Sequence, residues 1–345
     1  MKTTQAAESV EFEPLFDLRS RPSVPASARK AIAQPDSRSG DVYRMQSDLH
    51  FAVEVALTTG RPLLLRGEPG TGKSSLAPYL ARRLGWRYYE HVVTSTSTAT
   101  DLLWRFDAVR RLADAQAQNA KPESDYVSPG VLWWAQHRES ALAAAQRSGG
   151  AEPGAVSNSK RDPRRAVVLI DEIDKAHPDL PNGLLVALGS NQITVPYLDR
   201  PVELDLATIP PLQQELQRGV EIASVQVIVT TNEERELPAA FVRRCVTFSL
   251  THPDADQLVA IVRAHFHRKG DPFTPEDKAL ALAIAKRVEK LREQVEFGAH
   301  RPSTAEFLDA FRACRVRGVM PNASDKRWQL IERIALVKPG IGSLV

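Results

Sequence analysis

One short stretch restricts the possible folds more than any other part of the chain. Residues 67–74 read GEPGTGKS, and they follow the short apolar run PLLLR. A glycine, four residues and then Gly-Lys-Ser form a loop between a buried strand and a helix, because the glycines let the backbone curl until successive N–H groups point at one anion. The N-terminus of the following helix adds partial positive charge. The sequence therefore predicts a phosphate-binding loop between a strand and a helix.

The polar side chains of this loop have expected roles. We expect Lys73 to reach the β- and γ-phosphates of a nucleoside triphosphate and Ser74 to bind Mg²⁺. Pro78 falls inside the expected helix, where proline removes a hydrogen bond and can kink the element. The residues predicted to bind the nucleotide in this loop are Gly67, Glu68, Pro69, Gly70, Thr71, Gly72, Lys73, Ser74 and Ser75.

Short apolar runs alternate with helix-like segments as far as residue 250. Such runs between turn signals are typical of strands buried on both faces of a parallel sheet, so the alternation predicts an α/β fold over residues 46–250. A helix precedes the first strand and ends at Gly60. The expected strands are residues 62–67, 87–93, 166–171, 225–231 and 245–250.

The remaining segments have other patterns. Residues 1–45 lack periodicity, and we expect a partly flexible arm in which FEPLFDL docks locally. The Gly- and Ser-rich residues 147–165 predict an exposed loop, and ITVPYLDRPVEL alternates like a short hairpin. After residue 250 the strand patterns stop. Helical patterns at 256–266, 276–291, 305–314 and 326–336 predict a separate all-helical domain over 251–345.

Composition narrows the class of protein. The 345 residues suffice for one large domain and a smaller one. A net charge of +3 is too weak to imply nucleic-acid binding, although it does not exclude it. Cys245 and Cys314 lack the spacing of a zinc site and indicate reduced thiols of a cytoplasmic protein. We expect no membrane span and no secretory signal, since no apolar run is long enough for either.

Two acidic residues follow the apolar run AVVLI. Asp171 lies where the expected strand ends, at the edge of the sheet where ligands of open α/β folds bind, so we expect it to hold Mg²⁺ through its hydration shell. Glu172 is then placed to orient or deprotonate a water molecule near the γ-phosphate. Alone, the Asp-Glu pair would equally fit a strand end in solvent. Asp174 and Lys175 are interpreted as helix-start charges without a role.

Polar residues also follow the run VIVTT. We expect Asn232 to hydrogen-bond the attacking water or the γ-phosphate, and Thr231 could do the same. The segment LPAAFVRRC then ends in Arg243 and Arg244, two planar forks of donors suited to phosphate. Taken alone, this pair also fits a solvated helix end.

In this order, GEPGTGKS, VVLIDEIDKA, VIVTTN and LPAAFVRRC resemble the motifs of the MoxR-like AAA+ ATPases over residues 46–340. The resemblance implies a P-loop AAA+ core with a parallel five-stranded sheet of order 5-1-4-3-2, a helical lid, and rings that are usually hexamers. It also implies that Arg244, or alternatively Arg243, enters the ATP site of the neighbouring subunit and neutralises charge at the γ-phosphate.

The resemblance also implies two insertions that face a central pore and contact a substrate. One lies within TSTSTATDLLWRFDAVRRLADAQ and the other within QITVPYLDRPVEL. An aromatic residue in an amphipathic stretch equally fits core packing, and we assign Trp133 and Trp134 to the core. The candidate pore contacts are Leu103, Trp104, Phe106 and Tyr197.

The lid departs from the pattern of the resemblance. Ser303 and Glu306 form a capping box, which makes Ser303 the expected N-cap of a helix. Ala305 then occupies the place where the family usually has an arginine. Arg301, just before the cap, could reach the phosphates instead. This difference concerns the coupling between lid and nucleotide rather than nucleotide binding itself.

The sequence thus predicts a cytoplasmic ATPase that uses ATP and Mg²⁺. We expect it to form a homo-oligomeric ring, usually hexameric in such proteins, and to remodel or activate an unidentified protein client. A nucleic-acid motor and an ATP-dependent assembly switch within a larger complex are the alternatives. The hairpin VPYLDRPVELDL is acidic to neutral rather than basic, which disfavours nucleic acid as the partner.

Overall fold

The structure, a computed structural model, describes residues 40–190, 192–198, 202–203, 222–267, 272–294 and 301–337. Residues 1–39, which form most of the predicted arm and include FEPLFDL, lie outside the described residues. The chain divides into two compact units. The first contains Met45–Arg66 and Leu76–Ser249, and the second contains residues 40–44, Gly67–Ser75 and the described residues from Leu250 onward.

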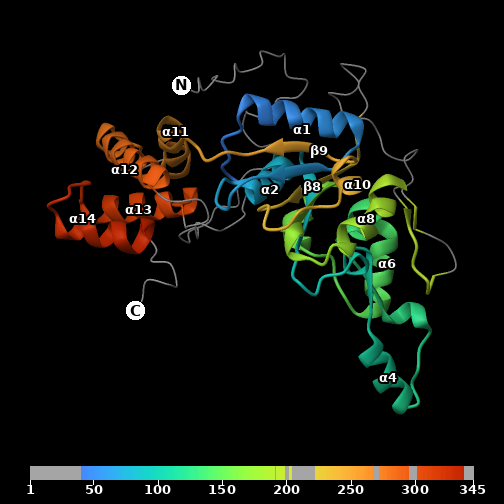
Figure 1. Ribbon diagram of the computed structural model, residues 1–345. Helices are drawn as coiled ribbons and strands as arrows, with labels where there is room; N and C mark the ends of the chain where they lie inside the picture. The colour runs from blue at the N-terminus through green and yellow to red at the C-terminus, as the bar shows by residue number, and fades with distance from the viewer. Residues whose placement is uncertain are drawn as a thin grey trace. The chain divides into compact units, whose positions relative to one another are not determined.

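The first unit is built on a five-stranded parallel sheet, in the order β2-β5-β8-β1-β9 (Figure 1). Starting from β9, this is the predicted order 5-1-4-3-2, since the other described strands belong to separate two-stranded sheets. The predicted strands are therefore confirmed, although β5 begins earlier than expected. The strands are β1 (Leu63–Arg66), β2 (Trp86–Val92), β5 (Asp162–Asp171), β8 (Val225–Thr230) and β9 (Val246–Ser249).

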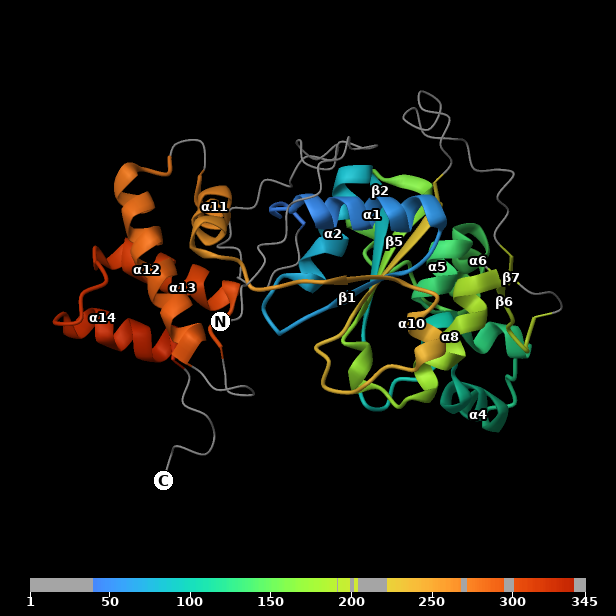
Figure 2. The same cartoon turned by 45° about the horizontal axis from the view of Figure 1, so that its top comes forward.

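Helices cover both faces of this sheet, which is why its strands consist of nearly continuous apolar runs. Successive side chains of a strand point to opposite faces, so Val168 and Ile170 of β5 face one core while Val167 and Leu169 face the other. Figures 1 and 2 show α1 on one side of the sheet and α5 and α8 on the other. These helices are α1 (Ser47–Thr59), α5 (Val131–Gln136) and α8 (Asp179–Ser190).

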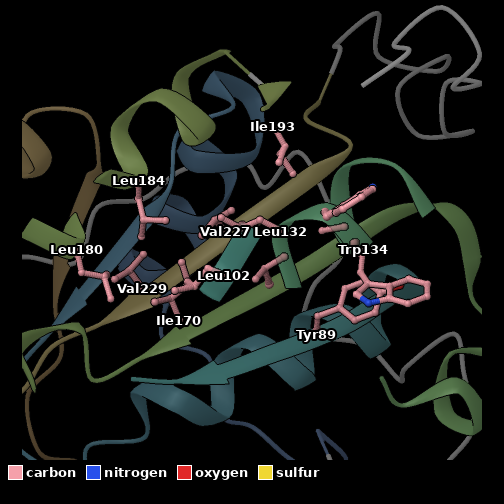
Figure 3. Packing of buried hydrophobic residues seen from close by; sticks show 14 of the residues in the cluster. Tyr89, Leu102, Leu132, Trp134, Ile170, Leu180, Leu184, Ile193, Val227 and Val229 are labelled. Atoms are coloured by element: carbon pink, nitrogen blue, oxygen red, sulfur yellow. The ribbon is translucent and has the colours of Figure 1, made fainter. Parts of the chain in front are cut away.

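The larger core lies between the sheet and the helices α3, α5, α6 and α8 (Figure 3). Trp133 and Trp134 of α5 are fully buried there, which confirms their assignment to the core. Figure 3 shows how the two sides meet: Leu102, Leu132 and Leu184 from helices, with Ile170 and Val229 from strands. The two helices not yet bounded are α3 (Ala99–Leu103) and α6 (Arg138–Ser148).

Helix α1 ends at Gly60 as predicted, because Gly60 adopts the left-handed conformation at φ 65°. Helix α2 (Lys73–Leu84) follows the glycine-rich loop and runs through Pro78 as one helix.

Along the chain, two segments between strands of the main sheet each contain a separate two-stranded antiparallel sheet. In the first, β3 (Trp104–Phe106) pairs with β4 (Val127–Pro129), and the segment between them holds α4 (Ala108–Gln116) and η1 (Glu123–Tyr126). In the second, β6 (Gln192–Ile193) pairs with β7 (Val202–Glu203), so the predicted hairpin is confirmed. Residues 199–201, between the paired strands, lie outside the described residues.

The prediction of a simple exposed loop at 147–165 is wrong in part. The segment contains α7 (Ala155–Asn158), and β5 already begins at Asp162. Asn158 is buried. Its side-chain oxygen accepts from the backbone N–H of Tyr88 at 3.0 Å, and its side-chain nitrogen donates to the carbonyl of Tyr88 at 3.2 Å. β2 lies at the edge of the sheet and has backbone groups to satisfy, and Asn158 satisfies them as a strand would.

The second unit confirms the helical C-terminal region. Its helices pack around one apolar cluster, to which Leu258, Ile284, Phe307, Phe311 and Trp328 contribute. The elements are α11 (Ala255–Phe266), α12 (Pro275–Gln294), α13 (Thr304–Arg317), α14 (Lys326–Ile331) and the π-helical turn η4 (Glu332–Leu336).

Cys245 and Cys314 are buried and form no disulfide. Burial raises the pKa of the Cys245 thiol to about 12 and that of Cys314 to about 11, so both stay protonated at neutral pH. Among the described helices, none combines the length and the apolar character needed to cross a membrane.

Candidate active site

The glycine-rich loop, Gly67–Ser75, belongs to the second unit and has a backbone that requires glycine. Gly67, Gly70 and Gly72 have φ of 133°, 78° and 95°, conformations that other residues rarely adopt. A Cβ atom at Gly67 would lie 2.2 Å from the backbone oxygen of Leu250. At Gly72 the nearest atom would be 3.6 Å away, on Tyr43. Space and backbone angle thus both require glycine at 67, and backbone angle alone requires it at 72.

Lys73 lies inside the curl of this loop. Its ammonium group donates to the carbonyl of Gly67 at 2.6 Å and to that of Glu68 at 2.8 Å, and only 5% of the residue is exposed. The hydroxyl of Thr71 donates to the same Glu68 carbonyl at 2.9 Å and closes the turn. The loop therefore surrounds one buried positive charge with carbonyl oxygens that an incoming anion could replace.

Glu68 connects the loop to the helical part of the second unit. One carboxylate oxygen accepts from the guanidinium of Arg301 at 2.7 Å, and the other lies 3.0 Å from Nε2 of His252. In the tautomer that carries its proton on Nε2, His252 donates to this carboxylate, since an ionised carboxylate only accepts. Burial, reinforced by nearby Arg292, lowers the pKa of His252, and Glu68 opposes this only in part. From the sequence, Glu68 is expected to bind the nucleotide, and no local pattern indicates either of these partners.

The start of α13 lies against the same loop. The N–H of Thr304 donates to the carbonyl of Gly70 at 3.3 Å, and a Cβ atom at Gly70 would lie 2.2 Å from Cβ of Ser303. The capping box of Ser303 and Glu306 is present as predicted. Arg301 precedes this N-terminus, and the structure therefore places it beside the glycine-rich loop.

In the first unit, the predicted acidic residues lie where β5 and β8 end. Asp171 closes β5, is 2% exposed, and accepts from the hydroxyl of Thr230 at 2.7 Å. The same hydroxyl accepts from the backbone N–H of Glu172 at 2.9 Å. Glu172 has a left-handed backbone, with φ 59° and ψ 51°. Thr230, which the sequence analysis did not single out, thus fixes both acidic residues from the neighbouring strand.

The Glu172 side chain is held from two sides. One carboxylate oxygen accepts from the amide of Asn232 at 3.2 Å, and the other accepts from Lys175 at 2.7 Å. The contact with Glu172 raises the pKa of Lys175. Thr231 is buried, and its hydroxyl accepts from the N–H of Glu233 instead. Of the two candidates in VIVTTN, the structure brings Asn232 and not Thr231 to Glu172.

From the sequence, Asp174 and Lys175 are helix-start charges without an assigned role, and both do lie in the 3₁₀ turn η2 (Ile173–Lys175). They also make contacts beside the acidic residues. Lys175 forms the ion pair with Glu172, and Asp174 is 2% exposed. One oxygen of Asp174 accepts from the N–H groups of both Asn232 and Glu234 at 3.0 Å. Spacing gives a signal for Lys175, because it lies three residues after Glu172 across the 3₁₀ turn Ile173–Lys175 and pairs with that carboxylate at 2.7 Å.

Arg243 and Arg244 follow the short helix α10 (Ala239–Val242). Both are exposed, and within the described part of the chain neither side chain makes a hydrogen bond or an ion pair. Backbone hydrogen bonds to Ala239 and Phe241 hold the segment that presents them. The two guanidinium groups are thus presented on a fixed backbone.

The candidate pore residues contact one another. The ring of Tyr197 stacks on Phe106 with centroids 4.4 Å apart and meets Trp104 edge-on at 5.6 Å. The indole N–H of Trp104 donates to the carbonyl of Thr194 at 3.2 Å. All three rings, and the neighbouring Leu103, are half-buried and pack against the core. The structure therefore joins the two insertions through an aromatic cluster: Trp104, Phe106 and Tyr197.

The sequence of the chain also matches a known protein family. The sequence profile of the AAA domain (dynein-related subfamily) matches residues 62–245, which is more than half of the chain. The chain belongs to this AAA family. The matched part of this AAA protein contains the glycine-rich loop, both acidic residues, Asn232 and the two exposed arginines, whereas Arg301 lies beyond it. AAA domains are in general ATP-binding ATPase domains.

Solved structures with a similar fold are distant in sequence from this AAA protein. A point mutant of RuvB from Thermotoga maritima is 15% identical with a TM-score of 0.45, covering 86% of this chain and 72% of that chain. RuvB from the same organism, described as a Holliday junction branch migration motor, gives 15% and 0.39, with coverages of 83% and 67%. An ATPase candidate from Cytophaga hutchinsonii gives 15% and 0.41, with coverages of 88% and 84%. No curated protein is significantly similar in sequence.

Proposed function

We propose that this AAA protein is an Mg²⁺-dependent ATPase of the MoxR type that works as a ring and remodels or activates a protein partner. The observation that carries the proposal is the contact between Glu172 and the amide of Asn232, beside the buried Asp171. A carboxylate that is oriented by a side-chain amide next to a metal-binding acid is suited to activating a water molecule. The domains we propose are an arm over 1–45, the AAA+ core over 46–250 and a helical lid over 251–345.

The residues present fit a magnesium ion. Ser74 and Asp171 would hold it, because Mg²⁺ prefers oxygen donors and takes only one or two of them from the protein, with water and phosphate oxygens as the rest. The hydrogen bond from Thr230 fixes the Asp171 carboxylate for this role. A bound Mg²⁺ would neutralise charge on the phosphate oxygens.

The chain's own residues would do the remaining chemistry. Lys73 exchanges the carbonyls of Gly67 and Glu68 for phosphate oxygens, and the N–H groups of the loop bind the same oxygens. Glu172 takes a proton from the attacking water, which Asn232 helps to orient. Arg301 reaches the phosphates from the start of the lid helix and replaces the arginine that is absent at Ala305.

The exposed arginines support the proposal of a ring. An exposed arginine that makes no hydrogen bond or ion pair with the described residues of its own chain is available to a second subunit. We propose that Arg244, with Arg243 as the alternative, enters the nucleotide site of the neighbouring copy in a hexameric homo-oligomer. Hydrolysis would then require two subunits, which couples each site to the next.

The partner would be a protein client held at the pore by the aromatic cluster and Leu103. Since the cluster joins both insertions, a movement of either strand pair would be passed to the other through these ring contacts. A nucleic-acid motor would instead show hydrolysis stimulated by DNA or RNA. An assembly switch would bind ATP with little turnover.

The test compares phosphate release by the wild type, Lys73→Ala and Glu172→Gln, together with binding of labelled ATP. We expect Lys73→Ala to lose ATP binding and Glu172→Gln to bind ATP while losing turnover by a factor of about 10² to 10⁴. Asp179→Asn is the matched control, because Asp179 is exposed and lies outside the site. Normal turnover by Glu172→Gln would remove Glu172 from its proposed role.

A further inference from the structure

We infer that Asp174 is a positioning residue for the reaction: it holds the loop after β8 so that the amide of Asn232 meets Glu172. The inference rests on the proposed function of Asn232 and Glu172. The structural half of it, that Asp174 fixes the loop, can be measured without nucleotide.

The loop is fixed through its backbone N–H groups. One oxygen of Asp174 accepts from the N–H of Asn232 and from that of Glu234, both at 3.0 Å. The N–H of Glu233, between them, donates to the hydroxyl of Thr231 at 3.0 Å. Three successive N–H groups therefore end on side-chain oxygens, and two of the three end on the same carboxylate. Hydrogen bonds to an ionised acceptor are stronger than neutral ones.

The backbone of this loop needs such support. Glu233 has φ 62°, in the left-handed region that residues with a Cβ atom rarely occupy. A non-glycine residue keeps this conformation only where its surroundings over-determine it. The bonds from Asp174 to the residues before and after Glu233 supply that constraint, and the ion pair of Glu233 with Arg66 adds a side-chain anchor.

The bond at residue 232 transmits the constraint to the site. The N–H that Asp174 accepts from and the amide that contacts Glu172 belong to the same residue, Asn232, so fixing its backbone leaves only its side-chain torsions free. Asn232 thus donates its backbone N–H to the Asp174 carboxylate and its side-chain amide to the Glu172 carboxylate. Loss of Asp174 would loosen the loop at Asn232 and Glu234, so the Asn232 amide would lose its fixed position while the Glu172 side chain kept its ion pair with Lys175.

Stability alone is a poor explanation for a carboxylate at this position. Asp174 is almost fully buried, and its second oxygen has no hydrogen-bond partner in the described structure. Burying a charge with an unpaired oxygen is unfavourable, and an asparagine would still offer one acceptor to both N–H groups. The charge gains its value by strengthening those two bonds.

The structural half is tested by amide hydrogen exchange on the nucleotide-free protein. We expect Asp174→Ala to speed exchange of the Asn232 and Glu234 amides by about tenfold or more, and Asp174→Asn to speed it less, because the asparagine keeps one acceptor. Asp179→Asn, an exposed acid nearby in the chain, should leave both amides unchanged. Wild-type exchange at residues 232–234 in either Asp174 variant would overturn the inference. The milder Asp174→Asn keeps the test available if Asp174→Ala fails to fold.

The functional half is tested by a double-mutant cycle with Asn232→Ala. We expect Asp174→Asn to lower kcat for ATP by about tenfold and to change KM by less than about twofold. In the Asn232→Ala background the same change should cost nothing further, since Asp174 acts through Asn232. Additive losses would overturn the inference. If the wild type does not hydrolyse ATP, the proposed function has failed, and the exchange experiment still decides whether Asp174 holds the loop.

Discussion

Glu68→Gln should strengthen nucleotide binding, although it alters the phosphate-binding loop itself. The guanidinium of Arg301 donates to the Glu68 carboxylate at 2.7 Å. Arg301 must therefore give up this hydrogen bond, or divide its donors between Glu68 and the ligand, before it can bind a phosphate. The two side chains are 42% and 30% exposed, which places the pair among surface ion pairs. Such pairs are worth about 0.2–1 kcal/mol, so releasing Arg301 should raise the affinity for ADP by up to about fivefold. The gain should shrink as salt is added.

Isothermal titration of ADP and of pyrophosphate measures this effect. The control is the same substitution in an Arg301→Ala background, where no arginine is left to release and the gain should disappear. Weaker binding by Glu68→Gln would refute the reasoning, because it would show that the Glu68 carboxylate supports the site rather than competes with the phosphate. An equal gain with and without Arg301 would show that simple repulsion between Glu68 and the phosphates is the cause.

Three further predictions concern the same structure. Gly67→Ala should destabilise the fold by about 3 kcal/mol or more, whereas Gly72→Ala should destabilise it by about 1–2 kcal/mol. The reason is that, of these two positions, only Gly67 would bring the new Cβ within 2.2 Å of a backbone atom. Urea unfolding of both variants measures the difference. His252 faces Glu68, Arg292 and Arg301, and its pKa lies below the ordinary 6.5. Its contribution to stability is therefore present above pH 6.5 and is lost as pH falls through the lower, folded-state pKa. His252→Gln should flatten this part of the plot of unfolding free energy against pH, and an unchanged plot would contradict the prediction. Tyr197→Ala should lower the free energy of unfolding by about 1–3 kcal/mol, because it removes both ring contacts of Tyr197. It should also speed protease cleavage at both insertions. If the β3–β4 pair stayed as resistant to the protease as in the wild type, the two insertions would be independent.

The elements of the fold could be predicted because their signals are local. Each strand of the sheet is an apolar run between turn residues, and each C-terminal helix repeats its apolar residues at helical spacing. The glycine-rich loop fixes the order of strand, loop and helix. The prediction of an exposed loop failed in part at 147–165. There the side chain of Asn158 makes hydrogen bonds like those of a neighbouring strand, and a single side chain leaves no periodic pattern in the sequence.

The partners within the candidate site were harder to predict, because they depend on contacts between distant residues. Nothing near Glu68 in the sequence indicates that Arg301 and His252 meet it. Thr230 contacts Asp171, and Asp174 contacts the N–H of Asn232, because β5 and β8 are neighbours in the sheet although they are distant in the sequence. The motif residues themselves could be identified from sequence, but the side chains that hold them in place could not.

The most direct test of the account mixes two inactive variants. Glu172→Gln keeps the arginine and lacks the base, whereas Arg244→Ala keeps the base and lacks the arginine. After subunit exchange at equal amounts, about a quarter of the interfaces in a ring should pair an intact Glu172 with an intact Arg244, and phosphate release should recover to about a quarter of the wild-type rate. A mixture as inactive as its components, despite demonstrated exchange, would contradict a site built from two copies of the chain.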